Sequence, residues 1–348
     1  MSNPGLLQNE NVAALDRRMA ENFLTGHWQM GGEREEEPKP WLWRWSVIYS
    51  CLKEAGEVVP LGKVDDPNNR RTVQLRNPAL SRGASRTLGM SVQLVNPGET
   101  AECHRHTNAA LRFVLESKGM YTTVEGERLL MEPGDLLLTP NWTWHDHANF
   151  TDAPAIWLDV LDGRLTRYLG AAFHEVYSEG RTQPVTKPDG YSKQRLGSIR
   201  PRTAIHGTQA FPFAYKWAET KRALEKLAEA GDASPNDGIL LEYTNPVTGG
   251  PTMPTIGCWI QMLRPGEETR KHRHTGNNIY HVVQGEGVTL AGKRDMERLE
   301  WGERDCFFVP SWCWHQFRNT SSAKPAIIFS VTDRPVLESL GLYREENT

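Results

Sequence analysis

Histidines recur in a spacing that suits a metal site. One residue separates His104 from His106. Two side chains at this spacing on a β-strand project to the same face of a sheet. His145 follows after enough chain for two or three further strands, so a small barrel can bring it beside the pair. Three neutral imidazoles suit Fe(II), Mn(II), Ni, Cu or Zn. They leave three positions on an octahedral ion, which suits a substrate that chelates through two oxygens, together with dioxygen.

The same pattern occurs a second time. A Gly–HRH–Pro–WxWH–Asn pattern frames both copies, and the second copy places His272, His274 and His315 as the first places its three histidines. An internal repeat determines the architecture before any single residue does. We therefore predict two similar barrels, with a second candidate metal site in the later one.

The intervening chain is rich in short alternating segments. From Val58 onward, apolar and polar residues alternate over short runs that Gly and Pro turns separate, which is typical of a barrel or sandwich. Helical spacing appears outside these runs, at Asn11–Leu24, Val47–Ala55, Ala210–Ala230 and Val336–Tyr343. We predict an all-β fold with helical additions, and a frayed end at Arg344–Thr348.

These patterns divide the chain into four regions. We predict an N-terminal helical arm at 1–60, a first, catalytic barrel at 61–165, a helical linker at 166–235 and a second, mainly structural barrel at 236–348.

Composition restricts the class of protein. The chain has 348 residues, a net charge of -3 and 24% charged residues of both signs, which argues against nucleic acid as a partner. No apolar run approaches the length of a membrane span, and Met1–Glu10 lacks the apolar core of a signal peptide. The five cysteines are odd in number and form no CxxC motif, so we expect reduced thiols in a cytoplasmic protein.

Polar residues on the same strands extend the chemistry. His147 lies two residues after His145 and should point into the same cavity, where it could transfer a proton to or from a substrate or serve a structural role. Arg112 and Asp159 lie on apolar strands, where an unpaired charge is costly to bury. The partner of Arg112 could be a protein acid or a substrate carboxylate. Asp159 could pair with Arg112 or orient His147.

The motifs resemble those of a known family. The two Gly–HxH and Gly–Pro–His–Asn patterns resemble cupin motifs, so the chain looks like a bicupin with two double-stranded β-helix (jelly-roll) barrels. Many cupins place a Glu shortly after the HxH pair, where Ala110 and Leu111 stand here. More closely, HRHTNAALRFVLESKG and EPGDLLLTPNWTWHDHAN resemble the gentisate 1,2-dioxygenase family, which includes salicylate and 1-hydroxy-2-naphthoate dioxygenases.

This resemblance implies a function. It implies an oxidoreductase of aromatic-compound degradation that uses Fe(II) and dioxygen to open the ring of a small aromatic carboxylic acid, with gentisate converted to maleylpyruvate, in a homotetramer. It also implies site residues: His104, His106 and His145 as iron ligands, and Arg112, His147, Asp159, Gln93 and Arg70 as catalytic or substrate-binding residues.

Other functions stay open. Salicylate, a halo- or nitro-substituted salicylate or 1-hydroxy-2-naphthoate could be the substrate. A cupin enzyme that does not use oxygen, or a cupin that only binds a small acid, is a more distant alternative.

The second barrel lacks the polar set of the first. Aligning the repeats places uncharged residues opposite the three polar ones: Tyr280 opposite Arg112, Phe317 opposite His147 and Ser330 opposite Asp159. We therefore expect the chemistry in the first barrel alone.

Overall fold

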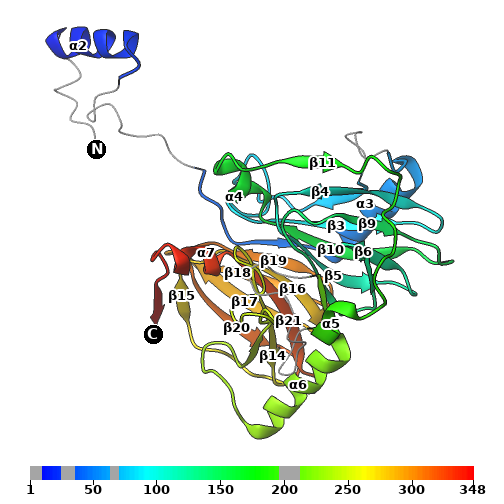
Figure 1. Cartoon of the computed structure of the whole chain (residues 1–348). Helices are drawn as coiled ribbons and strands as arrows, with labels where there is room; N and C mark the ends of the chain where they lie inside the picture. Colours follow the sequence, from blue (N-terminus) through cyan, green and yellow to red (C-terminus); the bar gives the residue numbers. More distant parts are fainter. Residues whose placement is uncertain (1–9, 25–35, 63–69, 196–211) are drawn as a thin grey trace. The chain divides into compact units, whose positions relative to one another are not determined.

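The computed structural model of the protein describes residues 10–24, 36–62, 70–195 and 212–348 (Figure 1). It divides into two units, Met1–Glu37 and Pro38–Thr348. The described part of the first unit is mainly helix α2 (Glu10–Glu21), none of whose residues is buried. This helix confirms the periodicity predicted for that stretch. The second unit contains both barrels.

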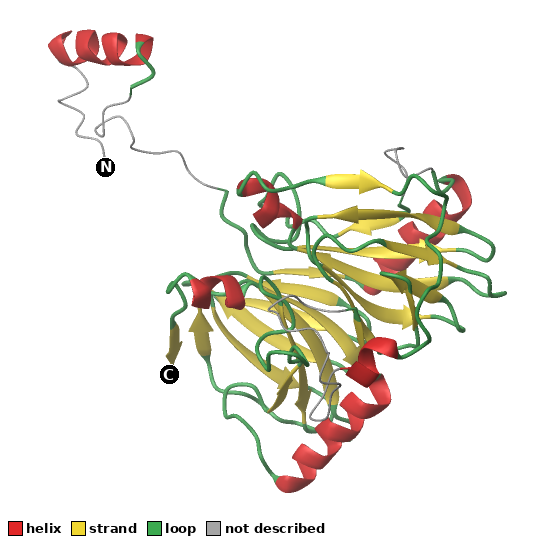
Figure 2. Cartoon of the chain, in the orientation of Figure 1, coloured by secondary structure: helices red, strands yellow, loops and turns green. Residues whose placement is uncertain are grey.

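The first barrel consists of two facing antiparallel sheets (Figure 2). The six-stranded sheet has the order β12-β8-β5-β10-β3-β2 and the five-stranded sheet the order β11-β4-β9-β6-β7. Their bounds are β2 (Thr72–Gln74), β3 (Gly89–Val95), β4 (Thr100–His106), β5 (Ala110–Glu116), β6 (Tyr121–Val124), β7 (Glu127–Leu130), β8 (Leu136–Thr139), β9 (His145–Ala148), β10 (Ala155–Leu161), β11 (His174–Val176) and β12 (Phe213–Tyr215).

The second barrel repeats this plan. Its sheets have the orders β1-β19-β16-β21-β14-β13 and β18-β17-β20-β15-β22. Their bounds are β1 (Trp41–Trp43), β13 (Ile239–Glu242), β14 (Gly257–Leu263), β15 (His272–His274), β16 (Asn278–Gln284), β17 (Gly287–Gly292), β18 (Glu297–Trp301), β19 (Cys306–Val309), β20 (Trp314–Asn319), β21 (Ala326–Thr332) and β22 (Glu345–Asn347).

Alternation along the strands separates the interior of each barrel from the contact between the barrels. On β3, Met90, Val92 and Leu94 point to one face and belong to a hydrophobic core that residues of both barrels share. Phe113 of the first barrel stacks on Phe329 of the second in this core, with ring centroids 4.4 Å apart. The other face of β3 lines the interior of the first barrel, so polar residues at alternate positions can meet there.

Five helices complete the second unit in its described ranges. They are α3 (Trp45–Val58), α4 (Gly163–Tyr168), α5 (Tyr191–Arg195), α6 (Trp217–Ala230) and α7 (Arg334–Ser339). Helix α3 buries Ile48 and Leu52 in the shared core. The predicted helices near α3, α6 and α7 are confirmed with different bounds. Helix α3 extends beyond its predicted range at both ends, α6 starts later, and α7 starts and ends earlier.

Four short segments differ from their predictions. Trp41–Trp43, in the arm predicted as helical, is a strand that pairs with β19 of the second barrel. The prediction of a frayed C-terminus is wrong, because β22 pairs with β15. Strands β11 and β12, from the predicted linker, pair with β4 and β8 of the first barrel. In each case a three-residue strand covers an otherwise open sheet edge, a pairing that local periodicity does not encode.

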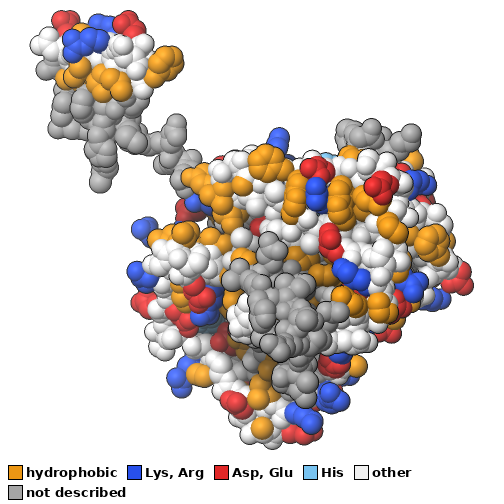
Figure 3. All heavy atoms as spheres, in the orientation of Figure 1, with side chains coloured by type: hydrophobic (Ala, Val, Ile, Leu, Met, Phe, Trp, Pro, Cys, Tyr) orange, Lys and Arg blue, Asp and Glu red, His pale blue; other side chains and the backbone are white. Residues whose placement is uncertain are grey.

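Two expectations from composition can be compared with the structure. All five cysteines are free thiols, as the count and spacing predicted. Among the described residues, no helix combines the length and the apolar character needed to cross a membrane. On the face drawn in Figure 3, basic and acidic side chains are interspersed, in keeping with the mixed charge of the sequence.

Candidate active site

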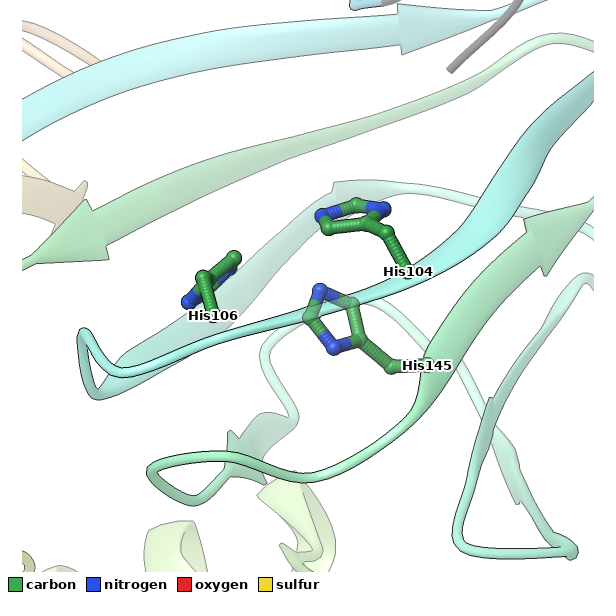
Figure 4. Close-up of side chains that lie close together, drawn as sticks. All are labelled: His104, His106 and His145. Carbon is green, nitrogen blue, oxygen red and sulfur yellow. The ribbon is translucent and has the colours of Figure 1, made fainter. Parts of the chain in front are cut away.

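Three histidines of the first barrel converge, as their spacing predicted (Figure 4). His104 and His106 project from β4, and His145 projects from the neighbouring β9, directly opposite His104 in the strand register. One nitrogen of each ring lies within 4.8 Å of one nitrogen of each of the others. The ring centroids of His104 and His145 are 4.4 Å apart.

Backbone carbonyls orient the three rings. Nδ1 donates to the carbonyl oxygen of a residue two positions away in each case, at 3.1 Å for His104, 2.9 Å for His106 and 2.9 Å for His145. A carbonyl can only accept, so for His106 and His145 the proton is on Nδ1 and the lone pair is on Nε2, whereas Nδ1 of His104 also faces the guanidinium of Arg70. Burial keeps the rings neutral, and lowers the pKa of His106 to about 4. Neutral, convergent imidazoles with a fixed tautomer fit a divalent transition-metal ion.

His147 lies in the same interior, two residues beyond His145 on β9. Its ring centroid is 6.0 Å from that of His145 and 5.2 Å from that of Trp157. Nδ1 shares a hydrogen bond with the hydroxyl of Thr122, whereas the buried Nε2 has no partner. The predicted placement is confirmed, and one ring nitrogen remains available for a ligand.

Arg112 and Asp159 form a buried ion pair. They are opposite each other on β5 and β10, and Nε of Arg112 is 3.3 Å from Oδ1 of Asp159. Their side chains are 4% and 8% exposed, and Arg112 also donates to the hydroxyl of Thr139. Of the two partners considered for Arg112, the structure shows the protein acid. Burial raises the pKa of Asp159 and Arg112 opposes that rise.

Arg70 and Gln93 complete the predicted set. Nη2 of Arg70 donates to the carbonyl of Glu102 at 2.9 Å and lies against the ring of His104, so a cation borders the triad. Burial and the nearby Arg112 lower the pKa of Arg70 to about 10, which leaves it charged at neutral pH. Gln93, on β3, is buried and its Nε2 has no hydrogen-bond partner.

Several polar atoms in this interior therefore lack a partner. Most buried polar atoms in proteins are hydrogen-bonded, so a group of exceptions indicates a polar ligand. Within the described residues, the group in the first barrel comprises Nε2 of Gln93, Nε2 of His147 and Nε1 of Trp157, whereas Nε of Arg112 and Oδ1 of Asp159 have only each other, at 3.3 Å.

The structure adds one residue that sequence reasoning missed. His174 lies on β11 opposite His106, and its ring centroid is 5.3 Å from that of His104. It is exposed, in a stretch predicted as helical linker. The repeat offered a signal, because Leu169-Gly170 matches Leu340-Gly341 and so places His174 opposite Glu345.

An arginine holds β11 next to the triad. Arg105 lies between the rings of Trp142 and Trp144, 4.4 Å and 4.6 Å from their centroids. It also forms an ion pair with Glu175 of β11 at 2.5 Å. Because Arg105 separates the two triad histidines of β4, this stack fixes the strand that carries them.

The second triad converges as well, but protein groups lie at Nε2 of two of its histidines, whereas Nε2 of His315 has no partner. His272, His274 and His315 bring one nitrogen each within 4.8 Å of the others. However, the amide of Asn278 donates to Nε2 of His274 at 2.9 Å. Oδ1 of Asp237 is 3.7 Å from Nε2 of His272. The cavity beside this triad is small, about 100 Å³.

Its surroundings match the predicted alignment of the repeats. Tyr280 and Ser330 are opposite each other, as Arg112 and Asp159 are in the first barrel. Phe317 packs edge-on against His315, with ring centroids 5.7 Å apart. Uncharged residues thus stand where the first barrel has its ion pair and His147.

Comparison with known proteins agrees with this arrangement. Residues 91–161 and 259–332 each match the cupin domain family. The chain is 41% identical to 5-aminosalicylate 1,2-dioxygenase of a Comamonas species, over 99% of this chain and 92% of that protein. It is 37% identical to 1-hydroxy-2-naphthoate 1,2-dioxygenase of Nocardioides sp. (strain KP7), over 99% of this chain and 89% of that protein.

A solved structure matches throughout. A variant of salicylate 1,2-dioxygenase from Pseudoaminobacter salicylatoxidans, in complex with gentisate, superposes with a TM-score of 0.89 at 31% identity. The match covers 100% of this chain and 98% of that one. The predicted bicupin fold is confirmed.

Proposed function

The chain belongs to the bicupin family of ring-cleaving 1,2-dioxygenases, and we propose that it opens a salicylate-type aromatic acid, with gentisate as the first candidate. Enzymes of this family are oxidoreductases that incorporate both atoms of dioxygen into the product. For gentisate, the bond between the carboxyl-bearing and hydroxyl-bearing carbons would break, and the product would be maleylpyruvate.

We further propose Fe(II) as the metal, held by His104, His106 and His145. The neutral triad with its Nδ1 atoms bonded to carbonyls supports this assignment. Bound there, Fe(II) would supply a centre with open positions at which a chelating hydroxy acid and dioxygen can meet.

The polar residues of the interior would handle the charges of the substrate. Arg70 is a cation beside the triad and can pair with the substrate carboxylate. Arg112 can donate from its guanidinium to the same group, while Asp159 holds that guanidinium in place through Nε. His147 can exchange a proton with the phenolic hydroxyl through Nε2, since Thr122 fixes its other nitrogen.

One observation supports this function above the others. Nε2 of Gln93 and Nε2 of His147 are buried without a partner in the barrel whose triad has no protein group bonded to Nε2 of His106 or His145 in the described chain. A chelating acid bound to the metal would supply hydrogen-bond partners to these polar atoms, while the free Nε2 atoms of the triad bind the metal. The partnerless atoms beside the second triad belong to that triad and to Asn278. The relatives act on 5-aminosalicylate and 1-hydroxy-2-naphthoate, so a substituted salicylate or 1-hydroxy-2-naphthoate stays the alternative substrate.

Oxygen uptake tests this proposal directly. Protein loaded anaerobically with Fe(II) should consume one dioxygen per gentisate, and product should accumulate in step. The same assay with 5-aminosalicylate, salicylate and 1-hydroxy-2-naphthoate ranks the alternatives. Iron-loaded, folded protein that consumes no oxygen with any of the four acids would refute the proposal and favour a binding cupin or a non-oxygenase enzyme.

We also propose a cytoplasmic homotetramer. The free thiols support a reducing compartment, and the resemblance to the family supports the assembly. Sedimentation velocity measures the assembly, and a monomer at micromolar concentration would contradict it.

A further inference from the structure

A large cavity opens beside the active site. It measures about 750 Å³ and lies between the loop that precedes β3, the end of β10 and helix α4. None of the described residues that line it is acidic, and they include five arginines: Arg76, Arg82, Arg86, Arg164 and Arg167. This contrasts with the mixed charges of the surface in Figure 3.

The cavity adjoins the residues assigned to the substrate. Gly89 and Ser91 line it, and Gln93 follows on the same face of β3, about 7 Å from Ser91 at the usual rise of a strand. Ser91 is opposite Asp159 in the register. Asn108 also lines the cavity, and its carbonyl accepts from Nδ1 of His106. The cavity therefore borders both the triad and the buried ion pair.

The described residues that line the cavity place no negative charge beside its arginines. Nε of Arg164 donates to the carbonyl of Arg86 at 3.3 Å, and its Nη1 donates to the carbonyl of Arg82. These bonds hold the loop against α4 and leave the positive charge in place. Two acids in neighbouring elements are buried and hydrogen-bonded elsewhere, Asp162 with Thr255 and Asp333 with Thr87.

The size and charge of the cavity exceed what a simple salicylate needs. The carboxylate of such a substrate already has Arg70 and Arg112 nearby. Pockets of about 300–1,000 Å³ accommodate drug-sized ligands, which are larger than a single substituted ring. At Gly89, an added Cβ would meet no atom closer than 4.0 Å, so the absence of a side chain there keeps the passage wide.

We propose that the arginine-lined cavity binds a second anionic group of the substrate, so that the enzyme prefers salicylate-type acids whose ring carries a further anionic substituent. This inference rests on the proposed ring-cleaving function. Several guanidinium groups around one anion act together, and each exposed pair contributes modestly.

Inhibition by inert benzene carboxylates tests the proposal. Benzoate, isophthalate and trimesate carry one, two and three carboxylates and lack the hydroxyl needed for chelation. Their inhibition constants, measured in competition with gentisate, should fall by about two- to fivefold per added carboxylate, because each exposed ion pair contributes about that much. The gain should shrink at high ionic strength, where charges are screened within about 8 Å or less.

Matched variants locate the effect. Arg82→Gln/Arg167→Gln removes two charges from the cavity and should abolish most of the increase in inhibitor affinity with each added carboxylate. Arg298→Gln/Arg318→Gln removes two charges from exposed side chains of the second barrel, 58% and 62% exposed, and should keep the gain. Gly89→Leu, which narrows the passage, should weaken trimesate more than benzoate.

The outcomes separate this inference from the proposed function. If gentisate is cleaved but inhibition does not rise with charge, or rises equally in both double variants, the inference is wrong and the function stands. If no acid is oxidised, calorimetric titration of trimesate into the folded protein still measures the affinity of the cavity for an anion. Equal trimesate affinity in the wild type and in Arg82→Gln/Arg167→Gln would then overturn the inference.

Discussion

The two barrels share a scaffold and differ in what surrounds their histidines. Arg105 lies between Trp142 and Trp144 in the first barrel. In the second, Arg273 lies 4.3 Å and 4.5 Å from the ring centroids of Trp312 and Trp314. Each arginine also forms a 2.5 Å ion pair with a short edge strand, through Glu175 or Glu346. The support of the triad is thus duplicated in detail.

What differs is the polarity of the interior. Tyr280 stacks on Phe307 at 4.6 Å, in a position where the first barrel has a charged pair. In the second triad, Asn278 donates to Nε2 of His274 and Asp237 lies 3.7 Å from Nε2 of His272. The comparison teaches that three convergent histidines do not by themselves mark an active site. The groups available to a substrate distinguish one barrel from the other.

The largest contrast should come from removing one histidine per barrel. His145→Ala should lower kcat/KM by roughly 1,000-fold or more, because the metal would contribute several kcal/mol to the rate. For His315→Ala, kcat/KM should stay within about twofold of the wild-type value, which corresponds to a change in activation free energy near the thermal energy. Iron content by elemental analysis and oxygen uptake measure both. Comparable losses in two folded variants would break the distinction between the barrels.

The second-largest effect should come from replacing His147. His147→Gln should lower kcat by about 100-fold, the lower range for loss of a general acid or base. Iron content should stay near the wild-type value, since His147 is outside the triad. Phe317→Leu at the equivalent position of the second barrel is the control and should leave kcat unchanged. A normal kcat for His147→Gln would assign that residue a structural role.

The buried ion pair should separate binding from stability. Arg112→Ala should raise KM about tenfold or more, the loss of a charged hydrogen bond. It should also lower the free energy of unfolding by about 3 kcal/mol, because Asp159 would stay buried without its partner. Arg112→Ala/Asp159→Ala should regain part of that stability but not the KM.

Denaturant unfolding and steady-state kinetics measure the two effects. Tyr280→Phe, at the equivalent position of the second barrel, serves as the control for both. If KM for Arg112→Ala equals that of wild type, the assignment of Arg112 to the substrate is wrong.

The smallest effect should appear in the second triad. Asn278→Ala removes the amide that donates to His274, and should raise the affinity of that triad for Zn(II) about three- to tenfold, the net effect of one hydrogen bond. Calorimetry in a His145→Ala background isolates the site, with His145→Ala alone as reference. Unchanged affinity would show that Asn278 does not compete with a metal.

Sequence reasoning predicted what depends on short-range periodicity. Alternation along a strand placed His147 on the same side as His145, and the repeat aligned Tyr280 with Arg112 and Ser330 with Asp159. The pairing of Arg112 with Asp159 stayed open, because an alternative partner, the substrate, leaves no trace in the sequence.

The missed features all depend on contacts between distant segments. His174 reaches the triad because β11 pairs with β4, about seventy residues earlier in the chain. The arginine cavity combines a loop, a strand end and helix α4 that are separated in sequence. A three-residue strand such as β1 has too little pattern to reveal which barrel it joins.

Strand β1 and helix α3 link the two barrels. β1 completes a sheet of the second barrel, and α3, which begins two residues later, packs against β3 of the first. Arg44, between them, forms an ion pair with Asp305 at 3.0 Å. Together with the hydrophobic core that both barrels share, these links mean that removing either half of the chain would expose apolar surface of the other. The second barrel therefore supports the fold of the first whether or not it binds a substrate.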